Sequence, residues 1–441
     1  MKNSVIIYNM KVLFVSNDLI GGNLAYLIKK EGHDVKLYIE DQGRHENFDN
    51  MVTKTYNWHK ELRWVGKNGL IVFDDIGYGE EQDELRKKGY TVFGGNKWAD
   101  KLEKDRVYGQ KIFKEYGLKT VPLKDFKNIK TAIAFVKRNK KAWVIKQNNH
   151  HYSKILNYIG ELSDGRDVVG MLENYSRNIK LCNEKVSLHE RIQGVEIGVG
   201  RYFNGKDWVG PIEFNIEYPK LFPGDVGPMT SEMGTLAWYS MDENNKLYKE
   251  IIEKMKPYLQ KIDFRGDFEI NCMVNETGAY PLEATPRLGS PIIHLHSEIH
   301  QSPWLEFLYA VAKGKKYNLK WKKGFGIVVL VAVPPFPNVE KTQRNLIYGS
   351  IVDIKNITDE ELKHIHYEEV AIKKHNKKYY VSDNRGYVLY VTGIASSIKK
   401  VQENVYGILK KIHIPRMFYR NDIGDSFLKI NQTKLKKWGW L

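Results

Sequence analysis

The stretch "GDFEINCMVNETGAYPLEATPRLGS", Gly266–Ser290, decides how the rest of this sequence is interpreted. It reads as two β-strands joined by the turn "NETG", and each strand carries one glutamate, Glu269 or Glu283. Successive side chains of a strand point to opposite faces. Asp267, Glu269 and Asn271 therefore share one face, and the apolar side chains between them share the other.

The pairing of the two strands sets the distance between the two glutamates. If Val274 pairs with Gly278 across a three-residue loop, Glu269 lies directly opposite Glu283. Opposed like charges destabilise a sheet. A divalent cation between them removes that repulsion, and two carboxylates with phosphate oxygens suit Mg²⁺. The alternative is that one glutamate faces solvent or pairs with a nearby arginine, and a two-residue loop would break this register.

An arginine follows the second strand in "LEATPRLGSP". Arg287 stands four residues beyond Glu283, and Thr285 lies between them. A guanidinium group grips a phosphate or a carboxylate with two hydrogen bonds. The hairpin and the arginine together predict a site for phosphates and a metal ion.

Strand–helix–strand patterns fill the first part of the chain. Residues 11–16, "KVLFVS", read as a strand, 24–33 as an amphipathic helix stopped by Gly32, and 34–41 as the next strand. The pattern repeats up to "YTVFGG", which predicts a parallel α/β sheet ending near residue 100. Strands dominate from about residue 186, and the chain closes with a helix and a basic tail.

Length and composition narrow the class of protein. The 441 residues, of which 42% are apolar, suit two to four domains. No run of about 18 apolar residues is present, so we expect no membrane span. The N-terminus lacks the pattern of a signal peptide. The two cysteines, Cys182 and Cys272, predict neither a disulfide framework nor a cysteine-rich metal site, so we expect a cytoplasmic protein.

The formal net charge of +16 raises the question of nucleic-acid binding. The lysines are scattered, however, and form no basic stripe interleaved with aromatic residues. A basic chain equally suits an enzyme that handles anionic substrates. We therefore expect small-molecule partners, with no nucleic acid and no membrane, in a monomer or a homodimer.

The hairpin resembles the metal-binding end of ATP-grasp enzymes, in which one glutamate lies on the first strand and "E-x-N-x-R" or "E-x-A-P-R" ends the second. The segment "VSLHERIQGVEIGV" resembles the hinge strand of that superfamily. The resemblance implies that Glu190, Arg191 and Ile192 lie beside the adenine of ATP and Glu196 at its ribose. A carboxylate suits ribose hydroxyls because it only accepts hydrogen bonds.

Two further segments complete this resemblance on the phosphate side. "AWVIKQ" resembles the strand whose lysine, here Lys146, reaches the nucleotide phosphates. "LEKDRVYGQKIFKEYGL" resembles the helix that usually bears a second lysine, and this chain has Arg106 at that position. Each segment alone is a weak signal, whereas their order and spacing together are specific.

The loop "GDVGPMTSEMGT" resembles "DTGPNTGGMGA" of the phosphoribosylamine–glycine ligase family, also called glycinamide ribonucleotide synthetase. The matching residues are Asp225, Gly227, Pro228, Thr230, Met233 and Gly234. The resemblance extends from about residue 11 to 430. It implies an α/β fold of ATP-grasp type with four parts: an N-terminal α/β domain at 1–100, a small ATP-grasp lobe with its linker at 101–185, a large lobe at 186–322 and a C-terminal domain at 323–441.

The chain also departs from this family. The family's "GNGGREHA" is replaced by "SNDLIGGNLA", whose Gly21–Gly22 pair is only a weak phosphate signal. Its "VGPE" is replaced by "VFDD", which ends in Asp74 and Asp75. The glycine-rich phosphate lid is replaced by "NNHHYSKILNYIG", which offers His151 and Lys154 instead. Past the hairpin, Thr285 replaces a metal-binding asparagine, and no acid follows Ser290.

Three explanations remain open: a divergent glycine ligase, an ATP-grasp ligase that joins another carboxylate to another amine, and a degenerate nucleotide-binding protein without activity. In the first two, the resemblance implies that ATP phosphorylates a carboxylate and that an amine displaces the phosphate, so the small-molecule partners would be an amino acid and an amine. The resemblance implies Mg²⁺ or Mn²⁺ on Glu269 and Glu283, with Lys146 and Arg106 neutralising the phosphates. It implies that Arg287 stabilises the transferred phosphoryl group or the carboxylate. The acceptor site is expected from Asp225, Gly227, Pro228 and Thr230.

Three histidines follow the hairpin at His294, His296 and His300. Their spacing could place them on one helical face. No supporting carboxylate pattern accompanies them, so we interpret them as structural or substrate-side residues and not as metal ligands.

Overall fold

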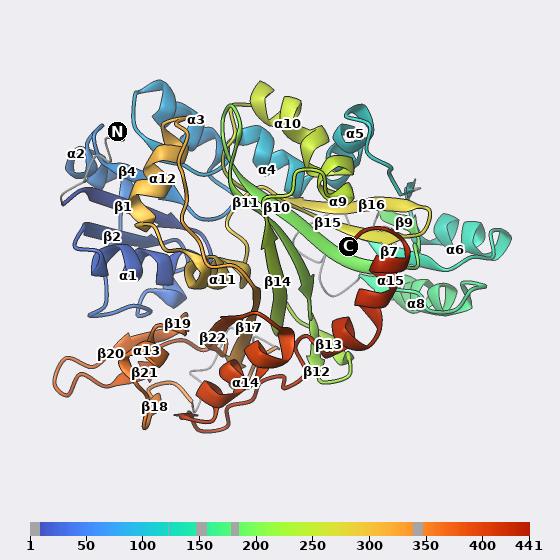
Figure 1. Ribbon diagram of the computed structural model, residues 1–441. Helices are drawn as coiled ribbons and strands as arrows, with labels where there is room; N and C mark the ends of the chain where they lie inside the picture. The colour runs from blue at the N-terminus through green and yellow to red at the C-terminus, as the bar shows by residue number, and fades with distance from the viewer. Residues whose placement is uncertain (1–8, 122, 147–156, 178–184, 338–346) are drawn as a thin grey trace.

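The computed structural model describes residues 9–121, 123–146, 157–177, 185–337 and 347–441. Within these ranges the strands form sheets of five, eight and four strands and three two-stranded ribbons. The five-stranded and four-stranded sheets lie at opposite ends of the molecule, with the eight-stranded sheet between them (Figure 1). None of the described helices is long and apolar enough to cross a bilayer.

The first sheet is parallel and has the strand order β3-β2-β1-β4-β5. The strands are β1 (Lys11–Ser16), β2 (Asp34–Ile39), β3 (Thr53–Thr55), β4 (Leu70–Phe73) and β5 (Val92–Phe93). The helical segments are α1 (Gly22–Lys30), η1 (Gln42–Arg44), η2 (Trp58–Glu61), α2 (Leu62–Val65) and α3 (Gly79–Lys87). Strands β1 and β4 are almost wholly buried, as expected for parallel strands covered on both faces. The predicted parallel α/β sheet is confirmed.

Two helices, α4 (Lys97–Lys104) and α5 (Arg106–Glu115), lead to the four-stranded sheet. Its order is β6-β9-β7-β8, with β6 (Leu123–Phe126), β7 (Trp143–Lys146), β8 (Tyr158–Ile159) and β9 (Val186–Glu190). The helices α6 (Ile129–Arg138) and α8 (Arg166–Arg177) pack together over a separate apolar core. Because β9 pairs with β6 and β7, this small lobe extends to Glu190, beyond the boundary expected at residue 185.

The eight-stranded sheet has the order β16-β15-β10-β11-β14-β17-β22-β19, and all its pairs are antiparallel. The strands are β10 (Val195–Asn204), β11 (Trp208–Glu217), β14 (Gly234–Ser240), β15 (Arg265–Asn275), β16 (Gly278–Thr285), β17 (Phe325–Ala332), β19 (Ile365–Tyr367) and β22 (Tyr387–Ala395). The sheet therefore runs without a break from the large lobe into the part expected as a separate C-terminal domain at 323–441.

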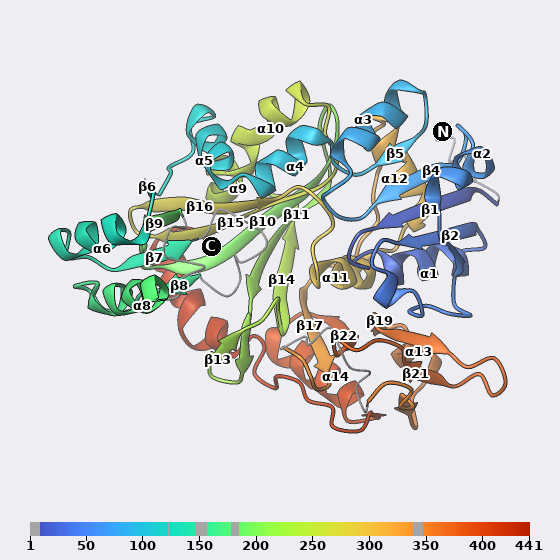
Figure 2. The ribbon, with the colours of Figure 1, turned by 180° about the vertical axis from the view of Figure 1, so that it is seen from behind.

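The remaining elements cover this sheet or extend from it (Figure 2). The helical elements are α9 (Lys246–Glu250), α10 (Ile252–Lys261), α11 (Ile292–Ile299), α12 (Trp304–Ala312), α13 (Asp359–Leu362), α14 (Ile398–Leu409), the π-helical turn η3 (Phe427–Asn431) and α15 (Gln432–Lys437). The short strands are β12 (Lys220–Phe222), β13 (Val226–Met229), β18 (Asp353–Ile354), β20 (Val370–Ile372), β21 (Tyr379–Val381) and β23 (Ile412–His413).

The register expected for the β15–β16 hairpin is wrong. Asn275 pairs with Gly278, so the loop has two residues, and a β-bulge follows Asn271. The Asn275 side chain accepts hydrogen bonds from the N–H and the hydroxyl of Thr277, at 2.9 and 2.7 Å, which stabilise the tighter turn. Glu269 consequently lies opposite Thr285 and not opposite Glu283.

The basic tail is folded and not extended. Helix α15 brings the chain end back over the hairpin (Figure 1). The side chain of Trp440 is 1% exposed, and its indole N–H donates to the carbonyl oxygen of Asn275 at 2.8 Å. The ammonium group of Lys246 lies 3.9 Å from the centre of the same ring. This cation–π contact helps to hold the tail on the hairpin.

Candidate active site

Polar side chains on one face of the eight-stranded sheet form two rows across neighbouring strands. The first row, from β11 to β16, is Glu213, Gly200, Glu269 and Thr285. The second row is Asn215, Gly198, Asn271 and Glu283. In both rows β10 contributes a glycine. The opposite face of β15 carries Phe268, Ile270 and Cys272, which are fully buried, as the strand alternation predicted.

The glycine of the second row is required by space. A Cβ atom on Gly198 would lie 2.3 Å from Oε1 of Glu269 and 2.4 Å from Oδ1 of Asn215. Contacts that short do not occur between real side chains. Gly198 therefore makes room for a carboxylate and an amide from the two flanking strands.

A small cavity of about 130 Å³ opens over these rows. Its wall includes Glu217, Glu232, Glu269, Asn271, Glu283 and Arg287. Both glutamates expected to hold a metal ion face this cavity, although they are not opposite one another. The two differ in environment, since Glu269 is 7% exposed and the Glu283 side chain is 56% exposed.

Glu269 is held by a neighbouring amide. Asn215 Nδ2 donates to Glu269 Oε1 at 2.7 Å and to Glu213 Oε1 at 2.6 Å. Burial raises the pKa of Glu269, and the charges of Glu213 and Glu217 raise it further. A bound cation would reverse this effect, because it stabilises the charged form of the carboxylate.

The residues expected at the nucleotide phosphates gather beside Glu283. Arg106, the first residue of α5, has its guanidinium group 3.9 Å from the Glu283 carboxylate. Lys146, the last residue of β7, is half-buried, and burial followed by the charge of Arg106 lowers its pKa. The charges of Glu283 and Glu196 act in the opposite direction. These four side chains, from four different elements, therefore form one electrostatic cluster.

The expected adenine segment lies where the chain passes from the four-stranded to the eight-stranded sheet. Glu190 ends β9 and its carboxylate pairs with Lys141 at 3.0 Å. Arg191 donates from Nη1 to the carbonyl oxygen of Gly160 at 2.8 Å, and Ile192 follows it with a half-buried side chain. This segment is thus the hinge between the two lobes.

Arg287 does not contact either glutamate within ion-pair distance. Its guanidinium group pairs with Glu103 at 3.1 Å and with Asp75 at 3.3 Å. Burial lowers the pKa of Arg287, but the charges of Glu103 and Asp75 outweigh burial and raise it. Asp75 follows β4, so this arginine joins the N-terminal sheet to the cavity wall.

The four residues expected at the acceptor site are not part of the cavity wall. They belong to the β12–β13 hairpin or follow it, and β13 is exposed to solvent. Asp225 accepts a hydrogen bond from Arg420 at 2.8 Å, and the hydroxyl of Thr230 donates to the carbonyl oxygen of Pro219 at 2.8 Å. Gly227 and Pro228 lie between them. The wall begins just after this loop, with Ser231 and Glu232.

Several polar residues of the site were missed in the sequence. They are Glu213, Asn215, Glu217, Ser231, Glu232 and Asn271. A signal was present in "PIEFNIEY", where Glu213, Asn215 and Glu217 alternate with apolar residues. That alternation places all three on one face of β11. Glu232 had no such signal, because it lies in a loop.

A buried histidine supports the first row from behind. His296, on α11, forms an ion pair with Glu213, and the hydroxyl of Tyr202 lies 2.8 Å from its Nδ1. Burial lowers the pKa of His296, but the charge of Glu213 outweighs burial and raises it. His294 instead stacks on Tyr390, with ring centres 4.4 Å apart. Among the described residues, no group of three or more His, Cys, Asp or Glu has the geometry of a metal site.

Comparison with known proteins identifies the architecture. Residues 104–292 match the family model described as phosphoribosylglycinamide synthetase, ATP-grasp (A) domain. The phosphoribosylamine–glycine ligase of Helicobacter pylori is 25% identical over 445 residues, which cover 96% of this chain and 98% of that protein. The ligase of Clostridium acetobutylicum is 25% identical over 365 residues, 78% of this chain and 81% of that protein.

Solved structures of related enzymes show a similar fold. The phosphoribosylamine–glycine ligase of Thermotoga maritima superposes with a TM-score of 0.68 at 21% identity, covering 94% of this chain and all of that one (100%). The biotin carboxylase of Campylobacter jejuni superposes with a TM-score of 0.64 at 11% identity, covering 97% of this chain and 98% of that one. Residues 104–292 therefore form an ATP-grasp domain, and most of the chain is similar to phosphoribosylamine–glycine ligases. The expected ATP-grasp fold is thereby confirmed.

The turn after β1 contains the glycine pair that the sequence offered as a weak phosphate signal. Asp74 Oδ2 accepts hydrogen bonds from the hydroxyl of Ser16 and from the backbone N–H of Gly21, both at 2.6 Å. The N–H of Gly22 donates to the carbonyl oxygen of Leu19 at 3.1 Å. Burial raises the pKa of Asp74 to about 7. The weak phosphate signal of the glycine pair is therefore not supported, because its N–H groups already have acceptors.

The lid expected to offer His151 and Lys154 lies outside the described residues. Whether the ATP-grasp protein closes over its phosphates with these side chains stays a prediction. Cys182 also lies outside these ranges, whereas Cys272 is a buried free thiol.

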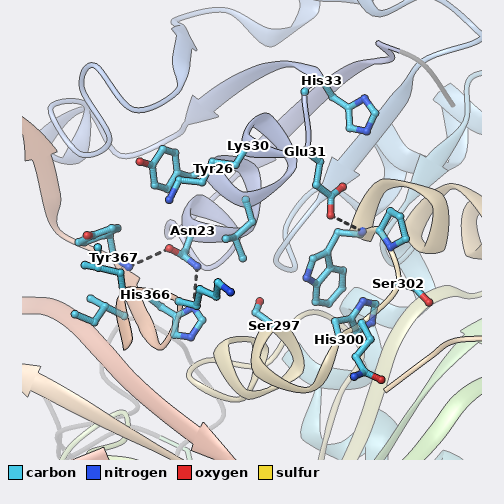
Figure 3. A pocket seen from close by; sticks show the side chains of 18 of the residues that line it. Asn23, Tyr26, Lys30, Glu31, His33, Ser297, His300, Ser302, His366 and Tyr367 are labelled. Atoms are coloured by element: carbon cyan, nitrogen blue, oxygen red, sulfur yellow. Dashed lines mark hydrogen bonds between the residues drawn. The ribbon is translucent and has the colours of Figure 1, made fainter. Parts of the chain in front are cut away.

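The larger cavity of this ATP-grasp protein, about 1090 Å³, lies elsewhere (Figure 3). It is bounded by α1, by the α11–α12 segment and by β19, and it shares no residue with the smaller cavity. Hydrogen bonds connect its walls: Asn23 accepts from the N–H of Tyr367 at 3.0 Å, and Glu31 accepts from the N–H of Trp304 at 2.7 Å. None of the expected nucleotide or metal residues lines it, so size does not identify the active site.

Proposed function

We propose that this protein is an ATP-dependent carboxylate–amine ligase that works as its phosphoribosylamine–glycine ligase relatives do. One observation carries the proposal: Glu269 and Glu283 face one cavity, and the cationic pair Arg106 and Lys146 lies beside Glu283. The two carboxylates suit a metal ion and the two cations suit phosphates, so together they suit a nucleoside triphosphate with its metal ion. The matched ATP-grasp domain contains all four residues.

The reaction takes place in two steps. A carboxylate oxygen of the first substrate attacks the γ-phosphorus of ATP, the bond to the β-phosphate oxygen breaks, and ADP leaves. The amine nitrogen then attacks the acyl carbon of the acyl-phosphate, inorganic phosphate leaves, and the amine gives up a proton. For glycine and phosphoribosylamine the product would be glycinamide ribonucleotide. The chemistry requires positioning and charge neutralisation more than covalent help from the protein.

The two glutamates fit a divalent cation. Mg²⁺ and Mn²⁺ prefer carboxylate and phosphate oxygens, and two carboxylates leave the remaining positions to the nucleotide and water. Mg²⁺ bound there would neutralise charge on the phosphates. Lys146 and Arg106 would hold the same phosphates from the other side, while Glu190, Arg191, Ile192 and Glu196 would contact adenine and ribose at the hinge.

Arg287 is proposed to stabilise the transferred phosphoryl group or the substrate carboxylate. It borders the cavity, but Glu103 and Asp75 already contact its guanidinium group. A guanidinium group has five N–H donors, so it can keep these partners and bind a further oxygen. The loop of Asp225, Gly227, Pro228 and Thr230 would border the acceptor side, since Ser231 and Glu232 continue it into the wall.

The proposal is tested by ADP release coupled to a spectrophotometric readout. ATP and Mg²⁺ are supplied with a panel of amino acids, with and without phosphoribosylamine. Glu283→Gln is expected to lower amine-dependent ADP release at least about 100-fold, since it removes a metal ligand. The matched control is Glu276→Gln, in the exposed hairpin turn. Unchanged turnover in Glu283→Gln would overturn the metal assignment, and ATP binding without turnover for any substrate pair would favour a degenerate binding protein.

A second candidate is a ligase that joins a different carboxylate to a different amine. The hydrogen bond from the N–H of Gly21 to Asp74 favours this second candidate. It occupies a backbone N–H at the turn expected to differ from the family sequence, so that N–H is not free to bind the phosphate of phosphoribosylamine. Turnover with an amine other than phosphoribosylamine would support this candidate.

A further inference from the structure

A histidine of helix α11 lies against the end of the polar rows that face the small cavity. Tyr202 of β10 pairs with Asp267 of β15, two residues along from the pair of Gly200 and Glu269. The hydroxyl of Tyr202 lies 2.8 Å from Nδ1 of His296, and Oδ2 of Asp267 lies 3.6 Å from the same nitrogen. The imidazole ring of His296 is buried, and groups from two strands of the sheet hold it on its Nδ1 side.

A chain of hydrogen bonds leads from the other nitrogen of this ring to a proposed metal ligand. Nε2 of His296 forms a hydrogen bond with Oε2 of Glu213. The second oxygen of Glu213, Oε1, accepts from Nδ2 of Asn215 at 2.6 Å. The same Nδ2 donates to Oε1 of Glu269 at 2.7 Å. All four side chains are buried, so solvent screens these contacts little.

The strand between β11 and β15 leaves room for this chain to cross it. Strand β10 carries glycine at position 198, between Asn215 on one side and Asn271 on the other. A Cβ atom on Gly198 would lie 2.7 Å from Nδ2 of Asn215, the atom that joins Glu213 to Glu269. The sequence of β10 is therefore matched to an amide in this place.

The two glutamates hold the Asn215 amide between them. Its Nδ2 carries two N–H groups, and Glu213 and Glu269 accept one each. If the Glu213 carboxylate rotated away, the amide would lose one of the two acceptors that fix it, and the restraint on Glu269 would weaken. His296 opposes that rotation, because it holds the oxygen of Glu213 that the amide does not use.

We propose that His296 is a positioning residue for the ligase: through Glu213 and Asn215 it holds the Glu269 carboxylate in the orientation that binds the divalent cation. This inference rests on the proposed function. Groups that lie behind metal ligands orient them, and their loss typically lowers metal affinity about 10- to 100-fold. His296 does not line the small cavity, so it acts on the cation only through its partners. A histidine that merely filled the core would change stability and leave metal affinity unaltered.

The test measures Mn²⁺ binding to the full chain saturated with ADP by electron paramagnetic resonance, with protein-free Mn²⁺–ADP as the reference. His296→Leu removes both ring nitrogens at a similar size, and we expect the Kd of Mn²⁺ to rise at least about tenfold. His296→Gln keeps an N–H donor for Glu213 and should recover most of that loss. His294→Leu is the matched control, since His294 is buried on the same helix and stacks on Tyr390. It should bind Mn²⁺ as the wild type does.

A double variant separates a chain of contacts from a general loss of stability. If His296 acts through Asn215, the variant Asn215→Ala and the double variant Asn215→Ala with His296→Leu should bind Mn²⁺ equally, because the chain is already broken. Additive losses in the double variant, or wild-type affinity in His296→Leu, would overturn the inference.

A measurement on the unaltered protein decides the inference if His296→Leu does not fold. Addition of Mg²⁺ with ADP should shift the nitrogen NMR resonance of Nε2 of His296 and leave the resonances of His294 in place. An unshifted His296 resonance at saturating Mg²⁺ would mean that the ring is not linked to the metal site.

Failure of the inference differs from failure of the proposed function. ADP release by the wild type, together with unchanged Mn²⁺ affinity in His296→Leu, overturns the inference and leaves the ligase function intact. No Mn²⁺ binding by the ADP-saturated wild type sinks the metal assignment of the proposed function, and the inference with it, whatever the His296 variants do.

Discussion

The carboxylate of Glu269 occupies the space that a side chain on Gly198 would fill. The Cβ of any larger residue at position 198 would lie 2.3 Å from Glu269 Oε1. The two residues are on adjacent strands, β10 and β15, so a side chain at position 198 would have to displace the Glu269 carboxylate. The position of a proposed metal ligand therefore depends on a glycine in the next strand.

Gly198→Ala is expected to impair catalysis more than folding. The new methyl group must push Glu269 and Asn215 away from the cavity, because backbone on both sides prevents β10 from retreating. We expect at least a tenfold rise in the Mg²⁺ concentration needed for half-maximal ADP release, with the far-UV circular dichroism unchanged. Gly407→Ala is the control, since a Cβ there meets no atom within 4 Å. A wild-type Mg²⁺ requirement in Gly198→Ala would contradict the role of Glu269.

Lys146 and Arg106 are expected to act on ATP affinity. A hydrogen bond to a charged group contributes roughly 1.5–3 kcal/mol, which corresponds to about a ten- to hundredfold change. Lys146→Met and Arg106→Met should each raise the Kd of ATP within that range, as measured by calorimetry. Lys130→Met, on the exposed face of α6, should leave ATP affinity unchanged. Equal affinities in all three variants would remove both residues from the nucleotide site.

Asp74 should make stability depend on pH. Its pKa is raised by burial from an ordinary 3.8 to about 7 in the folded protein. Between these values the folded state binds more protons than the unfolded state, so stability falls as pH rises through the folded pKa of about 7. We expect Tm to decline from pH 5 to pH 7.5 and the decline to be smaller in Asp74→Asn. Asp34→Asn, at an exposed position, should keep the wild-type slope.

Trp440 is expected to stabilise the large lobe. Replacing a buried tryptophan by alanine costs about 3–5 kcal/mol, and the loss of one hydrogen bond costs about 0.5–1.5 kcal/mol. Trp440→Ala should therefore lower the unfolding free energy in urea far more than Trp440→Phe, which keeps an aromatic ring but not the N–H that reaches Asn275. Equal losses in both variants would mean that the hydrogen bond, and not the packing, holds the tail.

Local patterns predicted much of the fold. The alternation of β15 and the strand–helix–strand order of the first sheet follow from side-chain periodicity, and Gly32, which has φ of 94°, stops α1 as expected. The register of the β15–β16 hairpin could not be predicted from periodicity. The turn at Asn275 and the bulge after Asn271 depend on single hydrogen bonds, which the side-chain pattern does not encode. Strand count alone also could not show that β17 joins the sheet of the large lobe.

The candidate site could be predicted only in part, because some of its residues come together through contacts between distant parts of the chain. Glu269, Glu283, Lys146 and Arg106 could be found through short motifs. The contact between Arg287 and Asp75 joins residues far apart in the chain, and no local pattern encodes it. Glu232 enters the wall through a loop, whose path depends on tertiary packing and not on periodicity. The acidity of the cavity is therefore a property of the folded chain.

The pairing of β14 with β17 has a consequence for synthesis on the ribosome. While residues 241–324 emerge, the edge of β14 carries unpaired backbone groups, because its partner strand has not yet been translated. Such an edge is a template for association with other nascent chains. Until Phe325–Ala332 has left the exit tunnel, this edge of the large lobe is therefore open to such association.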